Sequence, residues 1–214
     1  WQVMLLEGQR IGWAKKTTHS LENGTLRIRQ ESQMKLKRFG QSIDLQTAME
    51  TVERANGELI SFEFVIRNPP NRPTSQKGSI DGNELNLELT VNGRITKRRV
   101  VLPPKTKSPL LQERIFRQQK PRVGNVTSIA TWQPELSKPA TLKFRVDQPR
   151  ETELFDGSKA RLFKVFVENS AVPTLKLRGY VDEQGIWKKS ETDFLGKTLE
   201  TYAVSGKEAM QELA

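Results

Sequence analysis

The residue types that most often carry out acid–base, nucleophilic or metal chemistry are nearly missing from this chain. Its 214 residues include no cysteine, and His19 is the single histidine. The lack of cysteine excludes disulfides, thiolate catalysis and zinc–thiolate sites. His19 falls at the end of an expected strand, and without a G-x-S-x-G elbow we interpret it as a solvated histidine rather than a general base. The sequence therefore predicts no catalytic residue, no metal ligand and no cofactor.

Two further patterns resemble parts of catalytic motifs but lack their context. The run Gly196–Thr198 has the end of a phosphate-binding loop, yet Glu191 stands where the leading glycine would be, and strands surround it where a helix is needed. The acids Glu151, Glu153 and Asp156 gather near a turn without the spacing of a calcium loop. A spacing in sequence also does not give the carboxylate separation that glycoside cleavage needs. We interpret these acids as solvated turn residues.

Basic residues are the better candidates for contact with a partner. The formal net charge is +10 and the pI is near 9.9, so the surface favours anionic partners, although a solvated surface without a specific partner has the same charge. Aromatic residues are only 7% and none interleaves the basic runs, which disfavours nucleic acid and leaves protein or polysaccharide. The candidate residues for contact with an anion or a partner are Arg27, Arg29, Lys35, Lys37, Arg94, Lys97, Arg98 and Arg99.

Alternating apolar and polar residues predict strands over most of the chain. From Leu26 to Lys37 the pattern has a period of two, which no helix would give. Asn23–Gly24 predicts a type I′ hairpin turn, and Asn92–Gly93 marks another turn. About fourteen strands and two short helices predict an all-β class. We expect one large curved antiparallel sheet, a half-barrel wrapped around a helix. No run of about 18 apolar residues occurs, so no transmembrane segment is predicted.

The order of the segments predicts a single β-rich domain over residues 1–214. A strand meander at 2–102 precedes a helical insertion at 103–125, where Ser108–Pro109 is a typical helix start and the helix is expected to run through Gln119. A second strand meander at 126–204 and a capped C-terminal helix at 206–213 complete the predicted domain.

Both ends of the chain lead us to expect further protein. Ser205 and Glu208 have the spacing of a capping box, and the helix that it would start reaches the end of the chain. The chain begins with Trp1 rather than methionine, so we expect that an N-terminal piece has been removed.

Three stretches together carry a resemblance to a known family. The opening stretch Trp1–Trp13 and the closing stretches Gly179–Lys189 and Thr201–Ala209 resemble the N-terminal β-rich module of exported bacterial transglutaminase-like proteins. The resemblance implies a fold similar to the half-barrel of the LolA/LolB lipoprotein carriers, and a periplasmic or extracellular location. The catalytic Cys–His–Asp of that family cannot be carried over because the chain has no cysteine. The resemblance thus implies an accessory module and not the enzyme.

Three functions remain open at this point. The first is a non-catalytic accessory module that contacts a downstream transglutaminase-like domain, another protein or an anionic polymer or lipid of the cell envelope. The second is a carrier that holds an acyl chain or a lipoprotein in a concave face, which would need an apolar pocket. The third is a polyanion-binding surface, whose contacts would weaken steeply with salt.

Overall fold

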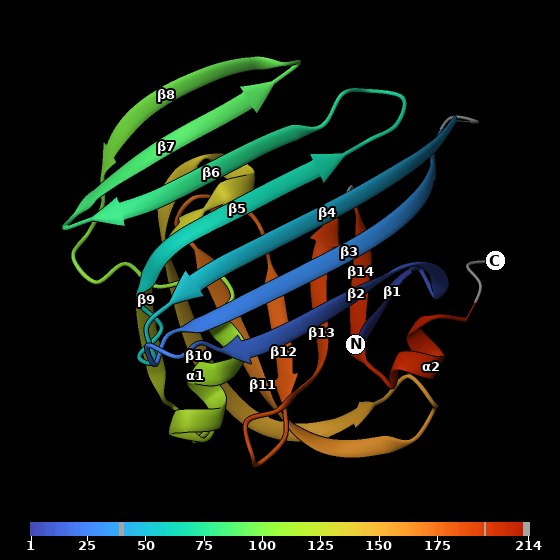
Figure 1. The fold of residues 1–214 in the computed structure, drawn as a ribbon. Helices are drawn as coiled ribbons and strands as arrows, with labels where there is room; N and C mark the ends of the chain where they lie inside the picture. The colour runs from blue at the N-terminus through green and yellow to red at the C-terminus, as the bar shows by residue number, and fades with distance from the viewer. Residues whose placement is uncertain (39–40, 195, 212–214) are drawn as a thin grey trace. The chain divides into compact units, whose positions relative to one another are not determined.

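The computed structural model describes residues 1–38, 41–194 and 196–211, without the side chains at 37, 38 and 41. Strands dominate the described chain and the helices are short (Figure 1). The strands are β1 (Gln2–Leu6), β2 (Gln9–Ser20), β3 (Leu26–Arg38), β4 (Gln41–Glu53), β5 (Leu59–Arg67), β6 (Thr74–Asp81), β7 (Glu84–Val91), β8 (Arg94–Val101), β9 (Val126–Gln133), β10 (Lys138–Glu153), β11 (Lys159–Asn169), β12 (Leu177–Val181), β13 (Trp187–Phe194) and β14 (Lys197–Ala203). The helices are α1 (Gln112–Gln119), α2 (Gly206–Ala209) and the 3-10 helix η1 (Pro134–Leu136).

The described strands form one antiparallel sheet. Hydrogen bonds join them in the order β8-β7-β6-β5-β4-β3-β2-β1-β14-β13-β12-β11-β10-β9. The two predicted meanders correspond to β1–β8 and β9–β14, and β1 pairs with β14 from Gln2 opposite Ala203 to Leu6 opposite Leu199. The prediction of an all-β class, with one antiparallel sheet and two short α-helices, is confirmed.

The described residues gather into two compact units. Unit 1 comprises Trp1–Ile11, Leu111–Ile129 and Ala140–Ala214, and unit 2 comprises Gly12–Leu110 and Ala130–Pro139. Each unit draws on stretches that are far apart in the sequence, so neither is a continuous segment of the chain. The single-domain organisation stays a prediction.

Unit 2 is built on the alternation that the sequence predicts. In β3 the side chain of Ile28 is fully buried, whereas its neighbours Arg27 and Arg29 are exposed. Phe62 and Trp132 pack with ring centroids 6.3 Å apart in the core of this unit. The buried apolar residues of this core are Ile28, Met49, Leu59, Phe62, Phe64, Leu85, Leu87, Leu102, Leu110 and Trp132.

Unit 1 has its own core, in which α1 packs on apolar residues of β10–β13. The Phe116 ring of α1 meets Phe144 at 5.7 Å and Trp187 at 5.6 Å, both edge to face. Such edge-to-face pairs add to the area that the rings bury. The buried residues of this core are Leu111, Ile115, Phe116, Leu142, Phe144, Val146, Val165, Val167 and Val181.

The first helix ends where predicted but begins later. It runs from Gln112 to Gln119, not from Ser108–Pro109. The buried Ser108 hydroxyl accepts a hydrogen bond from the amide of Leu110 at 3.1 Å, which holds the chain in a turn before the helix. A serine followed by proline is compatible with both a helix start and a turn, and here the turn is formed.

The predicted capping box at the second helix is present. The Ser205 hydroxyl accepts from the amide of Glu208 at 3.2 Å, and the Glu208 carboxylate accepts from the amide of Ser205 at 2.8 Å. The helix ends at Ala209, so it is shorter than the predicted 206–213, whose last two residues lie outside the described part. Neither described α-helix has the length and apolar character needed to cross a bilayer.

Candidate functional site

Strand β8 is the terminal strand of the sheet in the part of the chain that the structure describes. It pairs with β7 through a two-residue turn in which Asn92 has φ 52° and Gly93 has φ 81°. Two positive φ angles define a type I′ turn, whose twist suits a tight hairpin. The hairpin therefore presents one side of β8 as an edge of the sheet.

The other Asn–Gly pair behaves differently. At Asn23–Gly24 only the glycine has a positive φ, at 74°, so the predicted type I′ turn is wrong. The Asn23 side chain accepts a hydrogen bond from the amide of Thr25 at 3.1 Å, and the amide of Leu21 donates to the Thr25 carbonyl at 2.9 Å. This side-chain bond stabilises a longer turn, as asparagine often does.

Four of the predicted contact residues lie on β8 and are all exposed: Arg94, Lys97, Arg98 and Arg99. Alternation along the strand places Lys97 and Arg99 on one face and Arg94 and Arg98 on the other. Lys97 pairs with Glu88 at 3.4 Å, and Arg98 donates to the carbonyl of Ser137 at 2.9 Å. No carboxylate is paired with Arg94 or Arg99 among the described residues. The edge of β8 therefore carries positive charge that the described carboxylates only partly offset.

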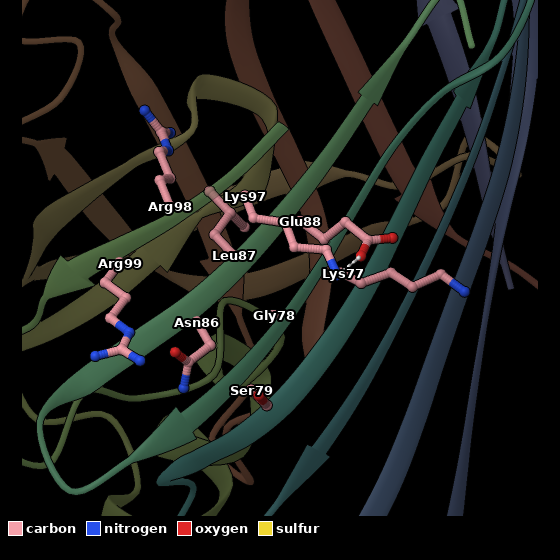
Figure 2. A pocket seen from close by; sticks show the side chains of 9 residues that line it. All are labelled: Lys77, Gly78, Ser79, Asn86, Leu87, Glu88, Lys97, Arg98 and Arg99. Carbon is pink, nitrogen blue, oxygen red and sulfur yellow. Dashed lines mark ion pairs between the residues drawn. The ribbon is translucent and has the colours of Figure 1, made fainter. Parts of the chain in front are cut away.

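A groove of about 660 Å³ lies over β6, β7 and β8 (Figure 2). Ser79, Asn86 and Arg99 are directly opposite one another on the three strands, and Figure 2 shows Asn86 and Arg99 side by side. The next row on the same face of these strands consists of Lys77, Glu88 and Lys97. Hydroxyl, amide and guanidinium donors on one face are a suitable arrangement for a carboxylate or another anion.

The predicted contact residues on β3 have a different electrostatic setting. Arg27 pairs with Glu50 at 3.4 Å, and Arg29 pairs with Glu31 at 2.8 Å. The hydrogen bond to Glu31 is the largest cause of the raised pKa of Arg29. Acids on the same face thus offset these two cations.

The last two predicted contact residues, Lys35 and Lys37 of β3, do not connect the β3 cations to the β8 groove. Lys35 is exposed and lies opposite Asp44 of β4, and the side chain of Lys37 lies outside the described residues. Two strands, β4 and β5, separate β3 from β6 in the sheet order. The structure therefore places the four cations on one strand, β8, with two on each face, and leaves the β3 group separate.

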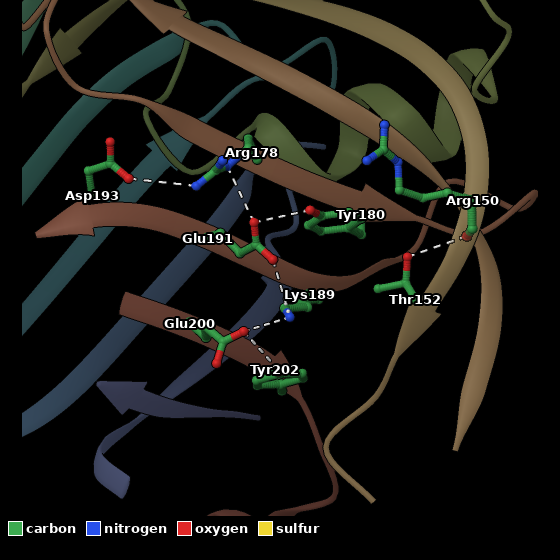
Figure 3. Close-up of polar contacts among 9 residues, drawn as sticks. All are labelled: Arg150, Thr152, Arg178, Tyr180, Lys189, Glu191, Asp193, Glu200 and Tyr202. Carbon is green, nitrogen blue, oxygen red and sulfur yellow. Dashed lines mark hydrogen bonds and ion pairs between the residues drawn. The ribbon is translucent and has the colours of Figure 1, made fainter. Parts of the chain in front are cut away.

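Sequence reasoning missed a second charged cluster, which we call the Lys189 network (Figure 3). The Lys189 side chain is only 10% exposed and its ammonium lies 2.6 Å from Glu200 and 3.2 Å from Glu191. It also lies 4.9 Å from the ring centroid of Tyr202. Burial lowers the pKa of Lys189, but hydrogen bonds and attraction from Glu200 and Tyr202 outweigh burial and raise it. The amine is therefore held protonated and is a poor nucleophile.

Further side chains extend the network in the same unit. The Tyr180 hydroxyl donates to Glu191 at 3.0 Å, and Arg178 pairs with Glu191 at 3.3 Å and with Asp193 at 3.6 Å. Burial is the main cause of the raised pKa of Tyr180. Each carboxylate in this paragraph has a cationic partner, so the network is well suited to hold β12 and β13 in register.

The residues that resembled parts of catalytic motifs occupy ordinary structural positions. His19 is exposed near the end of β2. Glu151 pairs with Lys159 at 2.9 Å, and the Asp156 carboxylate accepts from the amide of Ser158 at 3.0 Å. Hydrogen bonds from Ser158 lower the pKa of Asp156. The described residues contain no cluster of three or more side chains that could hold a metal ion.

Comparisons with known proteins support the fold and nothing finer. No protein-family model matches the sequence, and no curated protein matches it. A Brucella abortus structure, described as a beta-barrel-like protein of domain of unknown function DUF1849, has a TM-score of 0.65 and 11% identity over 95% of this chain and 94% of that chain. A DUF1089 family protein from Pseudomonas aeruginosa has a TM-score of 0.37 and 13% identity over 82% of this chain and 87% of that chain, which supports no argument.

Proposed function

We propose that this chain is a non-catalytic binding module that holds an anionic partner on the β8 edge. The observation that carries the proposal is the exposure of Arg94, Lys97, Arg98 and Arg99 on the terminal strand, beside a groove lined with further donors. Guanidinium groups bind carboxylates and phosphates through two parallel hydrogen bonds, which gives geometric selectivity as well as charge attraction. Exposed cations beside a groove therefore provide both the polarity and the geometry of an anion contact.

The proposed setting rests on the family resemblance of the sequence. In that setting the module belongs to an exported bacterial protein and precedes a transglutaminase-like domain. The partner is then a downstream domain of the same chain or another protein of the envelope. A full reading frame with a signal peptide upstream and a Cys/His-containing domain downstream is the observation that tests this setting.

The carrier alternative gains no support from the described grooves. The groove over β6–β8 is lined mainly by polar and charged side chains, and so is a second groove in unit 1 that includes Arg178, Asp193 and Glu200. An acyl chain needs an apolar lining. We therefore do not propose lipid transport.

The test compares two variants that remove the same charge from different strands. Lys97→Gln with Arg99→Gln changes the β8 edge, and Arg27→Gln with Arg29→Gln changes the β3 face. Labelled poly-L-glutamate is the probe, titrated by fluorescence anisotropy at rising salt. Loss of two charge-assisted hydrogen bonds should weaken binding at least about tenfold in the β8 variant, and the β3 variant should stay near the wild type.

The matched design separates a site from general attraction. Equal weakening in both variants would mean that only the net charge of +10 attracts the probe, and the proposed site would be wrong. Binding that does not change with salt would contradict a contact made by exposed charges.

A further inference from the structure

We infer that the β8 edge binds its partner as an added β-strand, and that the partner is an extended acidic segment of a protein. This inference rests on the proposed function and names the partner of the same surface. An extended peptide added to a sheet edge gains affinity from main-chain hydrogen bonds and specificity from alternate side chains. The geometry of β8 determines which backbone groups would form the main-chain hydrogen bonds and which side chains would provide the specificity.

The turn determines which backbone groups of β8 are open. Val91 and Arg94 flank the two-residue turn and are directly opposite each other. The residues that flank such a turn exchange both hydrogen bonds, and bonded and non-bonded pairs then alternate along the hairpin. Thr96, Arg98 and Val100 therefore bond to β7. The residues whose amide and carbonyl groups point away from the sheet are Ile95, Lys97, Arg99 and Val101.

The same four residues define a side-chain pattern on one face of β8. Ile95 is 61% exposed and Val101 is 68% exposed, and Lys97 and Arg99 lie between them. In a neighbouring strand, opposite charges and apolar pairs directly across from each other are favourable. The complementary segment thus reads apolar-x-acidic-x-acidic-x-apolar. This pattern is the same in both directions, so it fits a parallel or an antiparallel strand.

The other terminal strand, β9, does not leave its edge backbone groups open in the same way. The amide of Lys107 donates to the carbonyl of Ala130 in β9 at 2.7 Å, and Lys107 forms a parallel bridge with Thr131. These bonds occupy part of the β9 backbone. No such bridge is found along β8 in the described chain. The open edge and the cations therefore coincide on one strand.

A protein segment fits these observations better than a glycan or a nucleic acid. A sulfated glycan would pair with the cations but would leave Ile95 and Val101 exposed to water and the outward backbone groups without a matching ladder. An acidic β-strand satisfies the charges, the apolar side chains and the backbone together.

The experiment measures binding of a labelled peptide, Val-Thr-Glu-Thr-Glu-Thr-Val, to the whole chain. Its control has the same composition with both acids adjacent and both valines at one end. Four cross-strand pairs should give the patterned peptide about tenfold tighter binding than the control. N-methylation of the peptide amides that face β8 should abolish binding, and methylation of the alternate amides should be tolerated.

A backbone variant of the protein provides a second readout. Ile95→Pro removes one outward amide and should be accepted at an edge strand, since that amide makes no bond to β7. Ile95→Ala keeps the amide and is the matched control. We expect Ile95→Pro to weaken the patterned peptide at least about tenfold relative to Ile95→Ala. Hydrogen exchange at the amides of Lys97 and Arg99 should slow when the peptide is bound.

The outcomes separate this inference from the proposed function. Equal binding of the patterned and control peptides, or no effect of either N-methylation set, would overturn strand addition while the anion site stands. Binding of heparin with no binding of either peptide would replace the protein partner with a polyanionic glycan. Failure of every acidic probe, poly-L-glutamate included, would overturn the proposed function itself.

Discussion

Replacement of Lys189 by methionine tests whether the Lys189 network stabilises unit 1. The ammonium is the shared partner of two carboxylates, at 2.6 Å from Glu200 and 3.2 Å from Glu191. Methionine has a similar length and no charge, so the change removes the cation with little loss of volume. After the change, Glu191 keeps Arg178 at 3.3 Å, whereas Glu200 keeps only the hydroxyl of Tyr202 at 3.1 Å among the described side chains.

The size of the destabilisation depends on how deeply the two carboxylates that lose the ammonium are buried. Removal of one partner from a fully buried ion pair destabilises a protein by about 3–5 kcal/mol. The Glu191 and Glu200 side chains are 17% and 24% exposed, so water would solvate them in part. We therefore expect Lys189→Met to lower the free energy of unfolding by about 2–3 kcal/mol. For a chain of this size that lowers Tm by roughly 5–10 °C.

Urea titration, followed by tryptophan fluorescence and circular dichroism, provides the measurement. Lys143→Met is the matched control: Lys143 pairs with Glu168 at 3.6 Å and its side chain is 48% exposed, so we expect a change below about 0.5 kcal/mol. The double variant Lys189→Met with Glu200→Gln should recover about 1 kcal/mol, because the unpaired carboxylate is then gone as well. Equal effects of Lys189→Met and Lys143→Met, or strict additivity in the double variant, would refute the reasoning.

The same network predicts the direction of a pH effect. The pKa of Lys189 is raised in the folded state. Its contribution to stability is therefore fully present below the unfolded pKa of about 10.4 and declines as the pH rises above that value. The difference in Tm between the wild type and Lys189→Met should stay constant from pH 7 to 9 and narrow only above about pH 10.4. A difference that changed below pH 9 would assign the effect to another group.

Two further predictions concern local structure. Gly185→Ala should destabilise the chain more than Gly157→Ala. Both glycines have φ near 78°, which disfavours alanine by about 1–2 kcal/mol, but only the new methyl at 185 would clash with the Phe116 carbonyl oxygen. Urea titration compares the two, and equal losses would contradict the packing. Ser205→Ala should lower Tm at pH 7 and have less effect at pH 3. The hydrogen bonds of Ser205 lower the pKa of Glu208, so their contribution is present above about pH 4.3 and is lost as the pH falls.

The sequence predicts the strands well because their alternation is local. A half-exposed strand such as β3 places every second side chain in water, and this pattern is visible without knowledge of the fold. Positions that depend on competing local bonds are predicted less well. The first helix begins three residues after Pro109 because Ser108 forms a turn, and Asn23 stabilises a turn longer than type I′. Serine and asparagine side chains bond to nearby backbone in several ways, and the sequence alone does not select one.

The Lys189 network could be predicted from the sequence only with the pairing register of β13 and β14. The sequence Leu195–Gly196 is a candidate two-residue turn, and Leu195 lies outside the described residues. A two-residue turn at that place pairs Glu191 with Glu200 and Lys189 with Tyr202, as the structure has them. The signal was therefore present in the spacing of the turn. It was missed because alternation alone does not say which side chains of two strands are opposite each other.

The cations of β8 can also be interpreted as protection of the sheet edge, and the exposed apolar residues Ile95 and Val101 limit that interpretation. Charged side chains on a terminal strand discourage pairing with other chains. Protection alone would be served best by polar residues along the whole strand, yet Ile95 and Val101 are more than half exposed. Two exposed apolar side chains on the face that carries Lys97 and Arg99 favour pairing with any strand that supplies matching acids. We therefore infer that this arrangement rejects basic strands and accepts acidic ones, so the same charges that protect the edge also select its partner.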